Sequence, residues 1–277
     1  MTAAPALAGV VGWPIGHSRS PRLHGHWLRR YGIAGYYIPI ALPPDGLAAG
    51  LHALRTLGFR GINVTIPHKE AALALADEAT DLARAIGAAN TLTLRTDGTI
   101  HADNTDGYGF VANLRQQVPA WRAGAGPALV LGAGGSARAV VAALVAEGAP
   151  EVRVTGRTLS RAEALAAHFG PPVVALPWAA AGVAAGDAAV IVNTTPLGMA
   201  GNAELPLSLD GVPPTTLVTD LVYGGEPTPF VAEARRRGFA AVDGLGMLLH
   251  QAAPGFERWF GVRPEVDEAL RRAVLAP

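Results

Sequence analysis

The chain has 277 residues, half of them hydrophobic and 16% charged, which is enough to bury one large core or two ordinary ones. Its 22 basic and 22 acidic residues cancel, so the composition argues against a nucleic-acid partner or a charged membrane surface. The absence of cysteine excludes disulfides, thiolate catalysis and the cysteine-containing type of zinc site.

Neither a membrane anchor nor a leader peptide is expected. No uninterrupted apolar run reaches the roughly 17 residues that a membrane-spanning helix needs. The first residues, "MTAAPALAGVVGWP", lack the basic segment that begins a signal peptide. We therefore expect a cytoplasmic protein that holds no metal ion.

The N-terminal part alternates short apolar runs with amphipathic stretches. Ser20 stands where it would cap a first helix, with Pro21 at the first helical position. Asp97 and Gly98 lie between two β-rich runs, which predicts a hairpin over 90–104. We predict the other strands at 7–12, 35–40 and 58–66, and helices at 20–32, 45–58 and, as one or two helices, 68–87.

The remaining chain alternates strands and helices more regularly, after a helix at 106–118 and a break rich in Gly, Pro and Ala at 119–127. This alternation is typical of a parallel, doubly wound sheet. We expect two α/β domains, over 1–105 and 106–244, with the last helices (245–277) packing back on the first domain. The later strands are predicted at 128–131, 151–156, 172–176, 188–195, 216–223 and 239–243, and the last helices at 244–260 and 264–275.

The stretch "VLGAGGSAR" (130–138) joins a predicted strand to a predicted helix. Gly132, Gly134 and Ala137 occupy the three places of the G-x-G-x-x-G/A fingerprint of dinucleotide-binding folds. A diphosphate would lie at the N-terminus of the helix, where free N–H groups and the helix dipole favour an anion.

The end of the second strand of this unit indicates which dinucleotide is bound. An NAD site usually has Asp or Glu there, to bind the ribose 2′-hydroxyl. This chain has "GRTLSR" instead, so Arg157, Thr158 and Arg161 stand where the acid would be. Two guanidinium groups and a hydroxyl suit a 2′-phosphate, which favours NADP. Alternatively, Arg161 belongs to a solvated helix face.

Lys69 is the only lysine of the chain, and it follows Pro67 and His68 at the predicted start of a helix. Unlike a guanidinium, an ammonium can release its proton near neutral pH when its surroundings favour that. Lys69 is therefore a candidate for proton transfer. The alternative is an ordinary solvated lysine in a first helical turn.

Eight motifs together resemble the shikimate dehydrogenase family. They occur in the family's order and span nearly the whole chain, which makes the resemblance specific. The motifs are "GWPIGHSRSP" (12–21), "GINVTIPHKE" (61–70), "GAANT" (87–91), "DNTDG" (103–107), "GAGGSAR" (132–138), "GRTLSR" (156–161), "NTTPLGM" (193–199) and "DGLGMLLHQA" (243–252).

The resemblance implies NADP-dependent interconversion of 3-dehydroshikimate and shikimate, with a substrate-binding first domain and a Rossmann-type NADP domain. It implies Lys69 as general acid/base paired with Asp106. It implies substrate binding by Ser18, Ser20, Asn63, Thr65, Asn90, Tyr223 and Gln251. On the cofactor side it implies Asp81, Gly132, Ala133, Gly134, Gly135, Ser136, Gly156, Arg157, Thr158, Leu159, Ser160, Arg161, Thr194, Leu221, Gly244 and Met247.

Two positions depart from the family's pattern. Gly156 replaces the usual Asn and removes one side-chain hydrogen bond to the adenosine ribose, and Leu221 stands where the family often has Met. The residues also allow plainer roles, in which Ser20 only caps its helix and Asp106 caps the helix that it begins. Asn63 and Thr65 alternate along a strand and so face the same side, as a ring-binding wall requires.

Three other functions stay open from the sequence. A broader quinate/shikimate dehydrogenase that uses NAD is one, although the missing acid argues against NAD. A dehydrogenase of amino analogues is another. A ligand sensor that lost turnover is the third, but it would be expected to lack Lys69 or Asp106. The resemblance allows a homodimer or a monomer.

Overall fold

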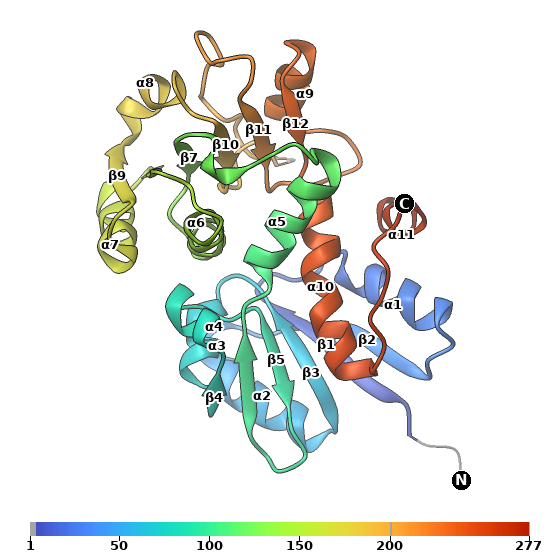
Figure 1. Cartoon of the computed structure of the whole chain (residues 1–277). Helices are drawn as coiled ribbons and strands as arrows, with labels where there is room; N and C mark the ends of the chain where they lie inside the picture. Colours follow the sequence, from blue (N-terminus) through green and yellow to red (C-terminus); the bar gives the residue numbers. More distant parts are fainter. Residues whose placement is uncertain (1–3, 200, 277) are drawn as a thin grey trace. The chain divides into compact units, whose positions relative to one another are not determined.

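The computed structural model describes residues 4–199 and 201–276. Residues 1–3, 200 and 277, which the expected domain ranges include, lie outside the described part. The chain forms two compact units (Figure 1). Unit 1 comprises Met1–Asp106 and Leu248–Pro277, and unit 2 comprises Gly107–Met247.

Unit 1 is built on a mixed six-stranded sheet in the order β2-β1-β3-β5-β6-β4. Strand β1 pairs in parallel with β2 and β3, whereas β5 pairs antiparallel with β3 and β6. The strands are β1 (Ala6–Gly12), β2 (Gly35–Ala41), β3 (Phe59–Val64), β4 (Glu78–Ala79), β5 (Thr91–Leu94) and β6 (Ile100–Asp103). The helices are α1 (Ser20–Arg30), α2 (Leu47–Thr56), α3 (Lys69–Ala74), α4 (Asp81–Ile86) and α11 (Glu268–Leu275), together with most of α10 (Leu245–Phe260).

The two faces of the unit 1 sheet have different partners. On one face, Ile62 and Val64 of β3 pack in a buried cluster with Leu51 of α2. On the other face, the indole of Trp259 from α10 lies directly over Gly61. Alternate residues of β3 therefore face either the apolar cluster or the α10 side, as the two-residue period of a strand requires.

Unit 2 is a parallel six-stranded sheet in the order β12-β11-β10-β7-β8-β9, which is the doubly wound order of dinucleotide-binding folds. Val130 belongs to the core on one face and Leu131 to the core on the other, so the strands are buried on both sides. The strands are β7 (Ala128–Leu131), β8 (Val152–Gly156), β9 (Val173–Pro177), β10 (Val190–Asn193), β11 (Leu217–Asp220) and β12 (Ala240–Val242). The helices are α5 (Asp106–Gln117), α6 (Gly135–Ala146), α7 (Leu159–Phe169), α8 (Ala181–Ala185) and α9 (Pro229–Arg236).

The predicted fold class, two α/β units of which one is a doubly wound parallel sheet, is confirmed. The hairpin around Asp97-Gly98 also forms, with Gly98 at φ +90°. The strand predicted over 58–66 ends earlier, at Val64, because the carbonyl of Thr65 accepts from the N–H of His68 in a turn. Two helices, α3 and α4, occupy the stretch 68–87.

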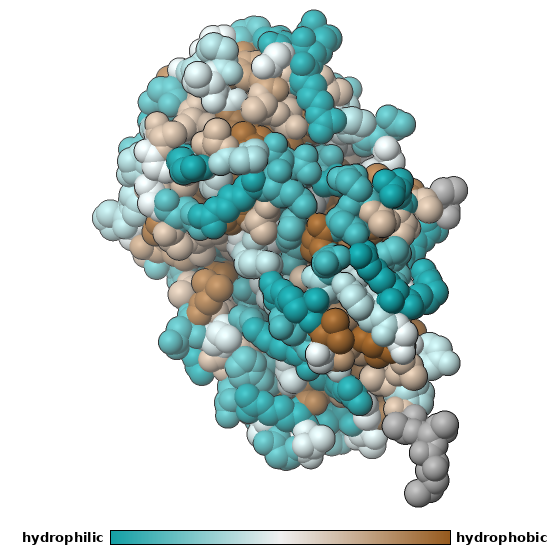
Figure 2. Space-filling view, turned by 45° about the vertical axis from the view of Figure 1, so that its right-hand side comes forward, coloured by the Kyte–Doolittle hydropathy of each residue, from teal (hydrophilic) through white to brown (hydrophobic). Residues whose placement is uncertain are grey.

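Hydrophilic and hydrophobic residues are interspersed over the face shown in Figure 2. Among the described residues, no helix combines the length and the apolar character that a membrane crossing requires.

Replacing Gly61 by Ala should destabilise the protein, because the added Cβ would lie 1.8 Å from Nε1 of the buried Trp259. Overpacking of this kind costs about 3 kcal/mol or more when a large rigid side chain must move. Urea unfolding followed by circular dichroism measures this loss. Gly25→Ala is the control, since the nearest atom to its added Cβ would be the guanidinium of Arg29, at 3.4 Å. In that helix Ala is more favourable than Gly by up to about 1 kcal/mol. Equal stability of both variants would contradict the packing described.

The stabilising contact between Arg258 and Asp103 should depend on pH. Burial would raise the pKa of Asp103, but hydrogen bonds from Thr80, Arg258 and the Asn104 N–H outweigh it and hold the pKa below its usual value. A carboxyl whose pKa is lowered by folding stabilises the protein above its unfolded pKa of about 4, and this contribution is lost as the pH falls through the folded value.

Arg258→Met should therefore lower the free energy of unfolding by about 1–3 kcal/mol at pH 7 and by less at pH 3. Urea unfolding at both pH values makes the comparison. Arg95→Met, which breaks an exposed ion pair with Glu78, should change the free energy of unfolding by less than about 1 kcal/mol at either pH. A loss for Arg258→Met that does not vary with pH would show that Asp103 is not its partner in solution.

Candidate functional site

An ion pair joins the two residues expected at the reacting centre. Lys69 is the first residue of α3, and its Nζ lies 2.5 Å from Oδ2 of Asp106, at the start of α5. Only 15% of the Lys69 side chain and 8% of the Asp106 side chain are exposed. A solvated lysine is therefore the wrong interpretation. Burial strengthens the attraction between the charges and aims the ammonium at one place.

Asn90 connects Asp106 to helix α10. Its Nδ2 lies 2.8 Å from Oδ1 of Asp106 and 3.1 Å from Oε1 of Gln251, within donating distance of both. Its Oδ1 accepts from the N–H of Thr105 at 2.9 Å. Gln251 is also held by the protein, because its Nε2 donates to the Leu248 carbonyl at 3.0 Å. The structure thus brings four predicted residues, Lys69, Asp106, Asn90 and Gln251, into one connected group.

The carboxylate of Asp106 does not cap its helix. Within the described residues its oxygens bind Lys69 and Asn90, and the N–H of Asp106 is itself bound by Oδ1 of Asn104 at 3.1 Å. The plainer alternative, a cap, is not what the structure shows, because α5 begins at Asp106 itself and its two oxygens are bound by Lys69 and Asn90. Asn104, two residues earlier, binds the Asp106 N–H in an Asx turn.

Asn63 lies on the face of β3 opposite the Ile62 and Val64 cluster, as the alternation predicts. Thr65 lies beyond the end of β3, in the turn whose carbonyl accepts from the His68 N–H, so the prediction that both residues belong to one strand was wrong. Asn63 is buried and its amide is fully engaged, since Oδ1 accepts from the Tyr37 hydroxyl at 2.7 Å. Its Nδ2 lies 3.2 Å from the Asn90 carbonyl. In the part of the chain that the structure describes, the half-buried Thr65 hydroxyl bonds to no protein group.

The two serines before α1 form a small turn. The helix begins at Ser20 itself and Arg19 takes the cap position without a side-chain bond, so the prediction of Ser20 as cap was wrong by one residue. Oγ of Ser18 instead accepts from the Ser20 N–H at 3.3 Å. Ser18 is half-buried and Ser20 is buried. Pro21 at the second position fits a helical first turn because its missing N–H needs no partner there.

Several supporting residues were not identified from the sequence. Thr105 lies inside the "DNTDG" motif, and its Oγ1 donates to the Gln251 carbonyl at 2.8 Å. His24 is fully buried, and its ring stacks on the Tyr37 ring with 3.8 Å between the ring centroids. Burial lowers the pKa of His24 to about 3. Burial also raises the pKa of Tyr37 well above its usual value. The position of His24 one turn after Ser20 is the only sequence signal for it.

The glycine turn of unit 2 has the shape that the fingerprint requires. Gly132 has φ +116°, and a Cβ there would lie 2.3 Å from Oγ1 of Thr194. Gly134 has no atom within 4 Å of the place for a Cβ, so no packing within the described chain demands a glycine there. The fully buried Ala137 lets α6 pack closely on the sheet. The open space at Gly134 suits the close approach of a ligand to the backbone.

The N-terminus of α6 lacks a side-chain cap, because Gly134 is the capping residue. The first N–H groups of the 12-residue helix, which begins with Gly135 and Ser136, therefore remain for an external acceptor. Ala133 lies against Gly156, at the end of the adjacent strand β8. These residues fit a diphosphate, as the sequence predicts.

The end of β8 presents two guanidinium groups and no acid. Arg157 and Arg161 are exposed, and within residues 4–199 and 201–276 neither guanidinium has a protein partner. Thr158 takes the cap position of α7 without capping it, and Leu159 and Ser160 follow in its first turn. A dinucleotide with a 2′-phosphate fits this edge.

The other expected cofactor residues of unit 2 lie where strands β10, β11 and β12 end. Thr194 follows β10, and its Oγ1 donates to the Leu131 carbonyl at 2.8 Å. A Cβ on Gly244 would lie 2.1 Å from the Leu221 carbonyl oxygen, so these two backbones touch. Met247 is buried in the unit 2 core.

Two residues belong to the other unit than most residues with the same expected ligand. Tyr223, expected on the substrate, belongs to unit 2 and is half-buried after β11. Asp81, expected on the cofactor, is the exposed first residue of α4 in unit 1. Their roles stay predictions.

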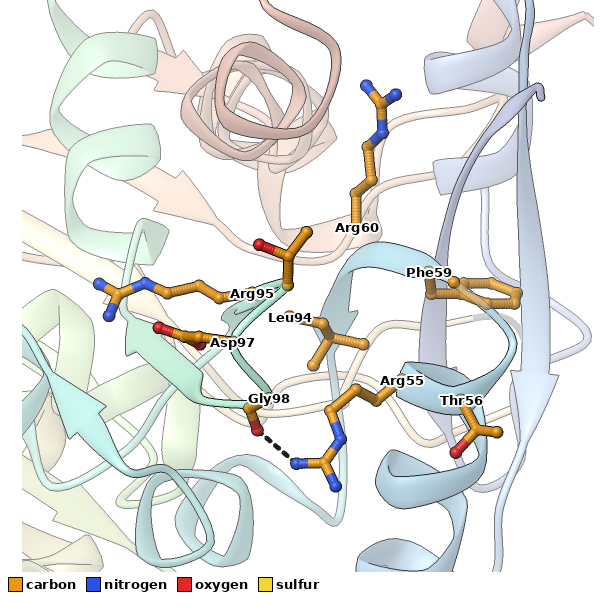
Figure 3. Close-up of a pocket in the computed structure, with 10 residues that line it drawn as sticks. Arg55, Thr56, Phe59, Arg60, Leu94, Arg95, Asp97 and Gly98 are labelled. Atoms are coloured by element: carbon orange, nitrogen blue, oxygen red, sulfur yellow. Dashed lines mark hydrogen bonds between the residues drawn. The ribbon is translucent and has the colours of Figure 1, made fainter. Parts of the chain in front are cut away.

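A cavity of about 450 Å³ beside the turn of the β5–β6 hairpin contains no group suited to bind a substrate or cofactor anion. Arg55 there donates to the Gly98 carbonyl, and Figure 3 shows Arg60 and Arg95 pointing in different directions. Arg95 pairs with Glu78 instead. Three guanidinium groups that do not converge form no anion site. Among the described residues no group of three His, Cys, Asp or Glu residues is arranged for a metal ion.

Three family models match the chain. They describe a shikimate dehydrogenase substrate binding domain over residues 10–92, a shikimate/quinate 5-dehydrogenase over 117–198 and a shikimate 5′-dehydrogenase C-terminal domain over 244–275. A protein of Paracoccus denitrificans (strain Pd 1222) named shikimate dehydrogenase (NADP(+)) is 62% identical over 98% of this chain and 96% of its own length.

Two solved structures are similar over almost the whole chain. The shikimate 5-dehydrogenase of Thermus thermophilus in complex with NADP(H) and shikimate has a TM-score of 0.85 and 39% identity, covering 97% of this chain and 99% of that one. The quinate dehydrogenase of Corynebacterium glutamicum in complex with NAD has a TM-score of 0.89 and 30% identity, covering 98% of each. The buried Lys69–Asp106 pair, the doubly wound sheet and this agreement along the chain lead to one conclusion: the protein belongs to the shikimate dehydrogenase family.

Proposed function

We propose that the protein is an NADP-dependent oxidoreductase that interconverts 3-dehydroshikimate and shikimate, a step of aromatic amino-acid biosynthesis. The observation that carries this proposal is the buried contact between Lys69 and Asp106, in a chain 62% identical to a protein named NADP-dependent shikimate dehydrogenase. A non-catalytic sensor would have no need to bury an ammonium beside a carboxylate, because burying a charge pair costs free energy unless it serves a purpose.

Unit 1 is the proposed substrate-binding unit. Ser18 and Ser20 would donate hydroxyl hydrogens to the substrate carboxylate, and the unbonded hydroxyl of Thr65 is available to a ring hydroxyl. Asn63, Asn90 and Gln251 would complete the wall, with Tyr223 contributed by unit 2. Asn63 and Asn90 already bond to protein groups, so their orientation is set before a substrate binds.

The chemistry requires a proton as well as a hydride. NADPH, when bound, supplies the hydride to the ketone carbon. The Lys69 ammonium would give a proton to the alkoxide oxygen that develops, and in the reverse direction the amine would take it back. Asp106 holds the ammonium in place, and its carboxylate would also accept a hydrogen bond from the neighbouring substrate hydroxyl.

Unit 2 is the proposed NADP-binding unit. The open backbone at Gly134 and the uncapped start of α6 fit the diphosphate, and the unpaired Arg157 and Arg161 fit the 2′-phosphate. Thr194, Leu221, Gly244 and Met247 would line the ribose and nicotinamide end. Asp81 of unit 1 is the least supported of the proposed cofactor residues, because no contact of its side chain favours that role.

Quinate is the second candidate substrate, with NAD as its cofactor. The similarity to the NAD-bound quinate dehydrogenase of Corynebacterium glutamicum favours it. The arginines at the end of β8 favour NADP instead. Steady-state assays with both polyols and both dinucleotides decide, and a higher kcat/KM for quinate with NAD would refute the proposed substrate. Amino analogues of shikimate belong in the same assay. A homodimer and a cytoplasmic location stay predictions.

Lys69→Ala should lower kcat about 10²- to 10⁴-fold while shikimate still binds, because it removes the general acid but not the groups that hold the ring. Turnover is followed by the absorbance of NADPH, and binding by isothermal titration calorimetry. Arg95→Ala, which removes an exposed positive charge from the same unit, serves as the control and should retain kcat. Full turnover by the Lys69 variant would refute its role.

Replacing Arg157 and Arg161 together by Ala should raise KM for NADP about 10- to 100-fold and leave KM for NAD within about threefold, because only NADP carries the phosphate that they would bind. The ratio of the two KM values is the measurement. Arg236→Ala removes one exposed arginine from α9, away from the end of β8, and as the control should change neither KM. Equal changes in both KM values would show that these arginines do not read the 2′-phosphate.

A further inference from the structure

Asp220, the last residue of β11, is a buried carboxylate without a cation. It is 1% exposed, and within the described chain no Lys, Arg or His pairs with it. An isolated buried carboxylate is costly, and burial raises the pKa of Asp220, against the hydrogen bonds that it accepts. A group retained at such a cost needs a structural or functional reason.

Three donors surround the carboxylate and come from three different segments. Oδ1 accepts from Nδ2 of Asn193 at 3.0 Å and from the N–H of Val222 at 2.9 Å. Oδ2 accepts from Oγ1 of Thr228, the cap of α9, at 2.8 Å. Asn193 ends β10 and is paired with Asp220 across the sheet. One side chain thus joins the ends of two neighbouring strands.

Asn193 passes this restraint to the loop after β10. Its Oδ1 accepts from the N–H of Thr195 at 3.0 Å and from the hydroxyl of Thr195 at 2.7 Å. Its Nδ2 also lies 3.1 Å from the Leu197 carbonyl. The same loop carries Thr194, whose Oγ1 lies 2.3 Å from the position that a Cβ of Gly132 would take. The position of this loop therefore sets the space beside the glycine turn.

Val222 carries the restraint to the loop after β11. Its N–H is held by Asp220, and the preceding Leu221 N–H donates to the Asn193 carbonyl at 2.9 Å. The carbonyl of Leu221 touches the backbone of Gly244. In doubly wound sheets ligands bind at this edge, outside the carboxyl ends of the strands. Asp220 is thus placed to fix both loops at the ligand-binding edge of unit 2.

We propose that Asp220 is a positioning residue for the dinucleotide, which holds the 194–197 and 221–223 loops through Asn193 and the Val222 N–H. The cofactor part of this proposal rests on the proposed function. Asp220 itself touches no ligand in this mechanism. Its carboxylate is required as an acceptor and not for its charge, since all three partners are neutral donors.

The experiment compares Asp220→Ala with Asp220→Asn. The amide oxygen of Asn can accept from Asn193 and Val222, while its NH₂ donates to the Thr228 hydroxyl, which can accept instead. Thr216→Val is the control, because Thr216 precedes the same strand at its other end and its buried Oγ1 donates to the Ala188 carbonyl at 2.6 Å. It removes one buried hydrogen bond without touching the loops.

The first measurement is NADPH binding, by its fluorescence, without substrate. Asp220→Ala should raise Kd about tenfold, as a small misplacement of binding groups does. Asp220→Asn and Thr216→Val should stay within about threefold of the unmodified protein. A Kd that Asp220→Ala leaves unchanged, or that Asp220→Asn raises as much, would overturn the proposal.

Hydrogen exchange supplies a measurement that needs no cofactor. The N–H groups of Thr195, Leu197 and Val222 donate to Asn193 Oδ1, Thr195 Oγ1 and Asp220 Oδ1, respectively. These amides should exchange at least about tenfold faster in Asp220→Ala than in Thr216→Val, because their acceptors depend on Asp220. If Asp220→Ala does not fold, Asn193→Ala must speed exchange at Thr195 and Leu197 and raise Kd in the same way. Unchanged hydrogen exchange in these variants would overturn the positioning role. If the unmodified protein shows no NADP-dependent turnover, only the proposed function is refuted.

Discussion

An ammonium and a carboxylate removed from water must satisfy each other, and the organisation of unit 1 follows from that constraint. Lys69 and Asp106 are 37 positions apart, and the fold of unit 1 brings their side chains together. Neither could be buried alone without a large cost. Asn90 then binds the second oxygen of Asp106 and ties it to Gln251. The Lys69–Asp106 pair is therefore held by the same bonds that join the hairpin to α10.

The two units prepare their proposed ligands in different ways. Unit 1 uses polar side chains whose bonds are made in advance, so Asn63 and Asn90 present fixed orientations. Unit 2 offers backbone N–H groups that no side chain covers, because the space at Gly134 is open and the start of α6 has no side-chain cap. These N–H groups are free to bind an anion. The difference matches the chemistry, because ring hydroxyls need directed partners whereas a diphosphate needs many donors around one charge.

Three buried aspartates show how one kind of group is stabilised by three kinds of partner. Asp106 has an ammonium, Asp103 has the Arg258 guanidinium with Thr80, and Asp220 has only neutral donors. The partner decides what the carboxylate can do. The first holds an ammonium in place, the second fastens α10 to β6, and the third can only order the loops that donate to it.

The sequence by itself determined the class of fold, because both-face burial produces continuous apolar strands and their alternation with helices requires a parallel sheet. Its motifs also paired Lys69 with Asp106, which meet in the structure, and they located the glycine turn after β7, where Gly132 has a positive φ. It misplaced the caps at Ser20 and Asp106, because both residues are the first of their helices and do not precede them. Only the tertiary structure decided that Asn90 joins Asp106 to Gln251 and that Asp220 binds Asn193. Such contacts depend on which strand and helix ends meet in space, and spacing along the chain does not encode that.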